Sequence, residues 1–521
     1  MTEANDPATL PVERDPGSGL LGRARMRPVL YPVGILAAFV LMSLVRTGVT
    51  PDAAGRPLLI AVAVGLLVPW VLGLVVGDRD RAGVLAIAVV MLLLAGQAPV
   101  VVVLPIAVFA LVLLEDRMNR GRPRRIRWAV VTRVMSAVTA ILLVAIGFAA
   151  VQEGRMVQIA HDLVAEAPLG HGTPSAIAGT GELPSVYLVL LDGYPRADKL
   201  MTEFGINIEP FTRALRDRAF AVADHSRSNH AATRETLASM FSGRVPDNPA
   251  ATDADFRPLI NEGTILREYR DRGYEVIAFA TGFGGVDLRQ ADRFVDAGQL
   301  NEFERHLLGI TGLMLVLDRA TPALLADQFR ARILTTLDGA RSLAGEPHDR
   351  PRMVLAHVMG PHSPLILGPT GERVGAEGMW MSIFDRLEYE GLGLDEYSRR
   401  LAGEIAYLNA RVLELVDSVV EADPDAVVVV FSDHGSGIRE QMDDLSASAR
   451  DGSMSDVDLR TANLLAVRSP GLPSIIDDRS TLVNLLPRIL RAYTGSGPAD
   501  VPETIYGQRS DGSRFVFDRP D

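Results

Sequence analysis

Long apolar runs dominate the first third of the chain, and short apolar runs alternate with helical patterns in the rest. An apolar run of about 20 residues is long enough to cross a bilayer as a helix. The runs of the first third are separated by short polar stretches, and none has a charged residue at its middle. We predict about five transmembrane helices, over residues 29–45, 57–77, 82–96, 99–114 and 134–152.

The third and fourth runs are shorter than the others and meet at Gly96–Pro99. A glycine and a proline within four residues favour a tight turn, so we predict a helical hairpin, with a single kinked span as the alternative. Intramembrane charges normally mark ion or proton pathways, and their absence from the middle of these runs disfavours a transporter. The runs are therefore interpreted as an anchor or a lipid-facing platform.

Arginine residues between the runs predict how the chain crosses the membrane. Residues 1–155 contain 16 Arg against 10 Asp and Glu, and the loop 115–133 alone holds seven of these Arg. Cytoplasmic loops are enriched in Arg and Lys, and five spans place this loop inside and the remainder of the chain outside. We predict a multi-pass plasma-membrane protein with a cytoplasmic tail (1–28), a transmembrane region (29–152), a linker (153–183) and an extracytoplasmic domain (184–521).

The linker and the domain after it differ in pattern. The first half of the linker fits an amphipathic helix on the membrane surface, and Gly170–Gly181 reads as flexible chain. Beyond it, strands alternate with helices, which predicts an α/β domain with a mostly parallel sheet flanked by helices. The expected strands are Val186–Leu191, Tyr274–Phe279, Met353–Val358, Ala426–Phe431 and Asn463–Val467, and the expected helices are Pro210–Phe220, 303–343, Tyr397–Val420 and Thr481–Ala492.

The amino-acid composition excludes several kinds of chemistry. The chain contains no cysteine, which excludes disulfides, thiolate metal sites and a cysteine nucleophile. Residues after 155 carry 36 basic and 54 acidic side chains. Nucleic-acid binding requires basic surface, so we expect no nucleic-acid partner.

Polar side chains follow three of the predicted strands. Asp192 ends the first strand, Asp433 and His434 follow the nearly all-valine strand, and His357 and His362 lie in and after the third. Ligands gather outside the carboxyl ends of strands in open α/β sheets. Taken singly, an Asp-Gly is most often a turn and a lone histidine is most often structural. Together, two carboxylates and imidazole groups make a shell for a divalent cation.

The stretch Ser228–Gly243 adds a hydroxyl to this set. Thr233 stands at the start of a predicted helix, and Ser242-Gly243 closes that helix ten residues later. A threonine there is most often a helix N-cap. Placed beside the cation shell, it is interpreted instead as a nucleophile.

These elements together resemble the alkaline phosphatase superfamily, in particular its sulfatase-like and lipoteichoic-acid-synthase-like membrane branch. Asp192-Gly193 matches the first metal-ligand motif, and Asp433-His434-Gly435 matches the last. His357-Val-Met-Gly-Pro-His362-Ser-Pro resembles the element that contacts the substrate's ester group. Thr233, Thr236 and Ser242-Gly243 match the nucleophile element in spacing. The resemblance covers about residues 185–475.

The resemblance implies a role for each matched residue. The metal ligands are Asp192, Thr233, Asp433 and His434, which hold one divalent ion (Mn, Mg, Zn or Ca). Thr233 and His362 are catalytic, and His357 and His362 bind substrate. No histidine follows His434, so we expect one ion, with a second held by His357 and His362 as the alternative.

Departures from the sulfatase pattern favour phosphorus over sulfur. The sulfatase nucleophile, formylglycine, is made from Cys or Ser, and Thr233 cannot supply it. Glu235 and Leu237 replace the Pro and Arg of that pattern. We expect a membrane-anchored hydrolase or transferase that acts on phosphoester groups of envelope lipids or polymers, with the bilayer and such a substrate as its partners. The alternatives are a sulfuric ester hydrolase and a non-catalytic envelope binding protein.

Overall fold

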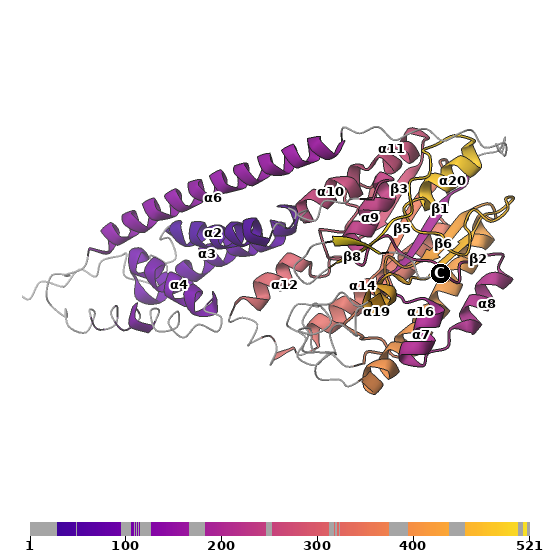
Figure 1. Cartoon of the computed structure of the whole chain (residues 1–521). Coiled ribbons are helices and arrows are strands. Elements are labelled where there is room, and N and C mark those ends of the chain that lie inside the picture. Colours follow the sequence, from indigo (N-terminus) through magenta and orange to yellow (C-terminus); the bar gives the residue numbers. More distant parts are fainter. Residues whose placement is uncertain are drawn as a thin grey trace, which may run out of the picture. The chain divides into compact units, whose positions relative to one another are not determined.

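The computed structural model describes residues 29–47, 51–94, 127–165, 183–245, 253–311, 323–374, 394–436, 454–508 and 514–517, with single positions between some of these ranges. The chain divides into two compact units. One holds the N-terminal apolar helices up to residue 153, and the other holds most of the chain after it (Figure 1).

Apolar helices make up the N-terminal unit. The stretches Pro51–Val76 and Trp128–Val151 are long and apolar enough to cross a membrane, and Tyr31–Thr47 is a shorter apolar helix. The fourth apolar run and the turn at Gly96–Pro99 lie outside the continuously described residues, so the five-span arrangement stays a prediction. The elements are α2 (Tyr31–Thr47), the 3₁₀ helix η1 (Pro51–Ala54), α3 (Gly55–Val76), α4 (Arg79–Leu94) and α6 (Trp128–Ala165).

Two further features of these helices are the length of α6 and the close packing of α3 on α2. Helix α6 continues to Ala165, so the first part of the linker belongs to the same helix as the last apolar run. A Cβ added to Gly65 of α3 would lie 2.7 Å from the Cα of Val33 in α2. Glycine thus permits a backbone approach of the kind by which membrane helices associate.

A seven-stranded sheet forms the centre of the second unit. Its order is β2-β7-β6-β1-β5-β3-β4, and β6, β1, β5, β3 and β4 run parallel. Strand β7 is antiparallel to β6, and β2 is antiparallel to β7. The strands are β1 (Val186–Leu191), β2 (Ala221–Val222), β3 (Glu275–Phe279), β4 (Arg293–Val295), β5 (Arg352–Val358), β6 (Val427–Phe431) and β7 (Leu465–Arg468), with a separate hairpin of β8 (Ile505–Gln508) and β9 (Arg514–Phe517).

Helices cover both faces of this sheet (Figure 1). Successive side chains of a strand point to opposite faces, so Val189 of β1 joins one core cluster and Leu188 joins the other. The first cluster includes α7 (Ala197–Phe204), α8 (Glu209–Asp217), α14 (Leu324–Ala344) and α16 (Leu394–Ala422). The second includes α9 (Thr233–Ser242), α10 (Asp253–Glu262), α11 (Thr264–Asp271) and α20 (Leu485–Thr494).

The predicted fold class is confirmed. Apolar helices precede an α/β domain with a mostly parallel sheet, and all five expected strands are present within two residues of their predicted bounds. The short strands β2 and β4 and the β8–β9 hairpin were not predicted. The stretch 303–343 was predicted to be mostly helical, and its described residues form α12 (Glu302–Gly309) and α14.

Candidate metal centre and nucleophile

The carboxyl ends of β6, β1 and β5 lie side by side in the middle of the sheet. Strand β1 pairs with both neighbours, so that Leu190 lies opposite Phe431 on one side and His357 on the other. The next residues along these strands therefore leave the sheet at one edge. This register brings the polar residues after β1 and β6 together.

Asp192 is the first residue after β1 and is 2% exposed. Its Oδ2 accepts a hydrogen bond from His357 Nε2 at 3.0 Å, and its Oδ1 lies 3.6 Å from His434 Nε2. Burial alone would raise the pKa of this carboxyl, but the nearby imidazoles of His362, His357 and His434 hold it well below its ordinary value. Asp192 is therefore a buried carboxylate held in its charged form by imidazoles.

Asp433 and His434 are the second and third residues after β6. Asp433 is fully buried, its Oδ1 accepts a hydrogen bond from the Gly193 backbone at 3.1 Å, and its Oδ2 lies 3.4 Å from His434 Nε2. The Gly435 carbonyl accepts from His434 Nδ1 at 2.7 Å. A carbonyl only accepts, so Nδ1 carries a proton, and in this neutral tautomer Nε2 has a lone pair for a metal. His434 thus presents a metal-ligating nitrogen to both carboxylates.

Thr233 is the first residue of α9, and Ala232 occupies the N-cap position without a side-chain capping bond. The Thr233 Oγ1 lies 3.5 Å from His434 Nε2. The helix ends at Gly243, which has φ +68° and whose N–H reaches Ser239. The expectation that Ser242-Gly243 closes this helix is met, and the hydroxyl of Thr233 faces the cluster instead of capping the helix.

The two histidines of the β5 segment have different positions. His362 lies on the loop after β5, and its ligand atom is within 4.8 Å of those of Asp192 and His434. His357 is 1% exposed and contacts the carboxylate of Asp192. That position differs from the expectation that His357 binds substrate, because the contact seen is with Asp192 and not with a surface open to a ligand.

The donor set fits a divalent cation. Three oxygens, Thr233 Oγ1, Asp192 Oδ1 and Asp433 Oδ2, lie between 3.4 and 3.6 Å from His434 Nε2. Ligand atoms about 2.1 Å from a tetrahedral ion are about 3.4 Å from one another. Oδ1 of Asp192 and Oδ2 of Asp433 are buried and accept no hydrogen bond in the described residues. Buried carboxylate oxygens of this kind are normally paired or bound to metal.

Two residues that support the site were not found from the sequence. Glu404 of α16 is fully buried, and its Oε2 accepts the backbone N–H groups of Ile366 and Leu367 at 2.9 and 3.1 Å, on the loop that carries His362. Asn463, also fully buried, donates to the carbonyl of Ser432 next to Asp433. In the sequence, one is a polar residue within a predicted helix and the other a polar residue at the start of a predicted strand. Such residues are common elsewhere in the chain, so neither indicated a functional site.

A central parallel sheet with carboxylates, imidazoles and a hydroxyl at its strand ends is the architecture of an alkaline-phosphatase-superfamily enzyme. Within that class, the family model described as Sulfatase matches residues 184–495. The chain therefore belongs to the sulfatase family, which is a family of enzymes.

Comparison with solved structures gives more distant likenesses. The C-terminal periplasmic domain of EcEptC from Escherichia coli is 15% identical, with a TM-score of 0.42 over 68% of this chain and 97% of that chain. The integral membrane protein lipooligosaccharide phosphoethanolamine transferase A (EptA) from Neisseria meningitidis is 13% identical, with a TM-score of 0.38 over 93% and 96%. BT1596, a 2-O GAG sulfatase, is 14% identical, with a TM-score of 0.37 over 60% and 70%. No curated protein matches the chain.

Proposed function

We propose that this enzyme transfers or hydrolyses a phosphoester group of an envelope lipid or polymer, with Thr233 as the nucleophile. The observation that carries the proposal is the set of oxygens of Thr233, Asp192 and Asp433 around His434 Nε2, all between 3.4 and 3.6 Å from it. These four residues would hold one divalent cation. When bound, the cation lowers the pKa of a coordinated hydroxyl and offsets charge on phosphoryl oxygens.

The first step forms a bond between Thr233 Oγ1 and phosphorus and breaks the ester P–O bond. The hydroxyl proton passes to solvent, and His362, as an imidazolium, donates a proton to the leaving oxygen. Backbone N–H groups at the N-terminus of α9 face the phosphoryl oxygens. In the second step, water or an acceptor hydroxyl attacks phosphorus and the bond between Thr233 Oγ1 and phosphorus breaks. The attacking oxygen releases its proton to solvent, and Thr233 Oγ1 and His362 each take one up from solvent.

The choice of phosphorus rests on the residue type at position 233. A threonine offers a secondary hydroxyl to an electrophilic phosphorus, and it cannot be converted to the formylglycine that sulfatases use. The choice of an envelope substrate rests on the two helices that are long and apolar enough to cross a membrane. An enzyme held at a bilayer has access to lipid-linked groups.

The proposed reaction is tested with a panel of aryl phosphate monoesters, phosphate diesters and sulfate esters, each with Mn²⁺, Mg²⁺ or Zn²⁺. We expect turnover of phosphate esters that depends on added metal. Thr233→Ala should lower kcat by at least about 10³-fold, and Thr233→Ser should retain part of the activity because it keeps a hydroxyl. Turnover of the sulfate ester alone would instead support the sulfuric ester hydrolase, and no turnover with bound metal would support a binding protein.

We also propose that the catalytic unit lies outside the cytoplasm, after five spans. The chain contains no cysteine, so single substitutions give unambiguous thiol labels. Met201→Cys, at a side chain that is 49% exposed in the catalytic unit, should react with an impermeant maleimide in intact cells. Arg79→Cys, at the first residue of α4, should react only after permeabilisation. The reverse pattern would contradict the topology.

A further inference from the structure

A five-residue stretch, Arg460–Leu464, connects the end of α19 (Met454–Thr461) to the start of β7. We refer to it as the connecting segment. It carries none of the proposed metal ligands. Each of its residues nevertheless makes hydrogen bonds to the three segments that do carry them, namely the exits of β1 and β6 and the loop before Thr233.

The exit of β6 is fixed at both ends by the connecting segment. Asn463 Nδ2 donates to the carbonyl of Ser432 at 2.6 Å, and the Ser432 N–H donates to the Leu464 carbonyl at 2.9 Å. The Gly435 N–H donates to the Arg460 carbonyl at 2.6 Å. The two residues between Ser432 and Gly435 are the proposed ligands Asp433 and His434.

The exit of β1 meets the same segment. The Arg196 N–H donates to the Ala462 carbonyl at 3.1 Å, and the Leu464 N–H reaches the Tyr194 carbonyl at 3.4 Å. The Ser432 hydroxyl also donates to Tyr194, at 2.5 Å. Tyr194 follows the proposed ligand Asp192 by two residues, so these bonds fix the start of this loop close to that carboxylate.

The loop that leads to Thr233 is held at three points. Ser226 Oγ donates to the Asn463 carbonyl at 2.6 Å, and the Ser228 N–H donates to the Thr461 carbonyl at 2.8 Å. Arg460 Nη2 donates to the carbonyl of Ala231 at 3.1 Å. The last of these contacts is two residues before the proposed nucleophile.

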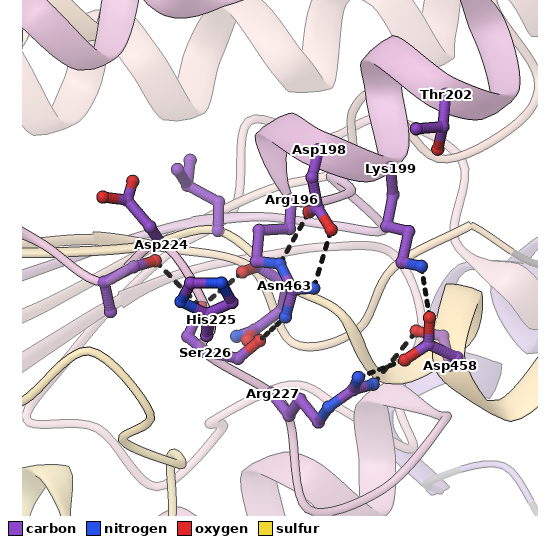
Figure 2. A network of polar contacts seen from close by, with 12 residues as sticks. Arg196, Asp198, Lys199, Thr202, Asp224, His225, Ser226, Arg227, Asp458 and Asn463 are labelled. Atoms are coloured by element: carbon purple, nitrogen blue, oxygen red, sulfur yellow. Dashed lines mark hydrogen bonds and ion pairs between the residues drawn. The ribbon is translucent and has the colours of Figure 1, made fainter. Parts of the chain in front are cut away.

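Charged side chains join two of these segments, the β1 exit and the loop before Thr233, to each other and to α19 (Figure 2). Arg196 bonds the carboxylate of Asp198 with two nitrogens and donates to the Ser226 carbonyl at 2.8 Å. Asp458 of α19 pairs with both Lys199 of α7 and Arg227. Burial alone would raise the pKa of Asp458, but its bonds to these two cations hold it below its ordinary value.

The hydrogen bonds of the connecting segment are rigid because the residues that make them are buried. Thr461, Asn463, Ser226 and Ser432 are all fully buried. A buried polar group that loses its partner carries the full cost of desolvation, so such bonds leave little room for alternative arrangements. Metal centres depend on residues of this type behind the ligands to orient them.

We propose that the connecting segment sets the distances among Asp192, Thr233 and Asp433–His434, and that Asn463 is its main positioning residue. Asn463 is the one member that bonds the β6 exit through its side chain and the Thr233 loop through its carbonyl. The proposal rests on the proposed metal site, and it deepens that proposal by naming what holds the site in shape.

The test is Co²⁺ binding by the purified full chain, followed by visible absorption, with turnover measured in parallel. Asn463→Ala leaves the Ser432 carbonyl without its donor and frees the adjacent Asp433. We expect Co²⁺ affinity to fall by about 10- to 100-fold and the absorption bands to change shape. We expect kcat to fall by about 10²-fold, with KM within about threefold, because the defect is in geometry and not in substrate contacts.

Asn261→Ala is the matched control. Asn261 is a buried asparagine of α10 that bonds the backbone carbonyls of Arg257 and Asp287 at 3.1 and 3.2 Å, away from the ligand loops. It should lower stability to a similar degree and leave the Co²⁺ spectrum unchanged. A wild-type spectrum and affinity in folded Asn463→Ala, or the same spectral change in the control, would overturn the proposal.

Ser226→Ala gives a second, milder variant. It removes the 2.6 Å bond from Ser226 Oγ to the Asn463 carbonyl and a longer, 3.5 Å contact with the Ala223 carbonyl, so it decides the matter if Asn463→Ala does not fold. We expect a loss of Co²⁺ affinity of about threefold to tenfold, and no loss would contradict the role of the segment. Because Co²⁺ binding needs no turnover, absent phosphoesterase activity in the wild type would refute the proposed function without deciding this inference.

Discussion

The exits of β6 and β5, on either side of β1, bring histidine to the site in two different ways. After β6, Asp433 and His434 are the second and third residues beyond the strand end, and both face the cluster. After β5, His362 comes four residues beyond the strand end on a loop that Glu404 holds from α16. The direction of β6, together with the connecting segment, places Asp433 and His434, whereas the carboxylate of Glu404 holds the loop of His362. The β6 exit should therefore determine metal binding, and the β5 exit should tune catalysis.

The largest effect is expected at the β6 exit. His434→Ala removes the nitrogen around which the oxygens of Thr233, Asp192 and Asp433 are arranged. We expect the purified variant to lose bound metal and its activity to fall by at least about 10³-fold. Metal content after dialysis against a weak chelator, measured by elemental analysis, checks this. Stoichiometric metal in both His434→Ala and Asp433→Ala would refute the ligand set.

The β5 loop should give a smaller and different effect. His362→Ala should lower kcat by about 10²-fold because a proton donor to the leaving oxygen is lost. Its metal content should stay close to the wild-type value. An equal loss for esters with good and poor leaving groups would contradict the role, since a good leaving group needs less protonation.

His357 should act through Asp192 and so affect metal affinity. His357→Leu removes the 3.0 Å hydrogen bond to Asp192 Oδ2, and we expect metal affinity to fall by about tenfold. His357→Gln keeps an N–H donor at a similar reach and should recover most of the affinity. Titration calorimetry with Mn²⁺ measures both. A raised KM with unchanged metal affinity would instead return His357 to the substrate-binding role expected from the sequence.

The smallest effect is expected at Glu404. Glu404→Gln replaces two charge-assisted bonds to Ile366 and Leu367 with neutral ones, which are about half as strong. We expect kcat to fall by about threefold to tenfold through a less ordered His362 loop, with metal affinity unchanged. Combining this variant with His362→Ala should add no further loss. Additive losses would mean that Glu404 acts elsewhere.

The contrast between local and long-range placement also explains which site residues could be predicted from the sequence. Residues adjacent to a buried strand, such as Asp192, Asp433 and His434, were predicted because strand direction alone fixes where they emerge. Thr233 was found from its spacing to Ser242-Gly243, which the ten residues of α9 match. The local sequence pattern is therefore sufficient to predict residues that lie next to a strand or at the start of a helix.

Contacts between residues far apart in the chain could not be predicted from the sequence pattern. His357 lies within β5, and its burial against Asp192 depends on the pairing of β5 with β1. The contacts of Asn463 with Ser226 and Ser432 join residues 237 and 31 positions away. Strand β4, at three partly exposed residues, is too short to show a pattern. These features arise from tertiary packing, which overrides local preference.

The central claim is that Thr233 forms a covalent bond to the transferred group. The most direct measurement is mass spectrometry of the enzyme acid-quenched during turnover of a phosphate ester, followed by peptide mapping. We predict a phosphorylated peptide that contains Thr233 and is absent from Thr233→Ala. Turnover by Thr233→Ala at the wild-type rate, or a phosphorylated residue elsewhere in the site, would contradict the account.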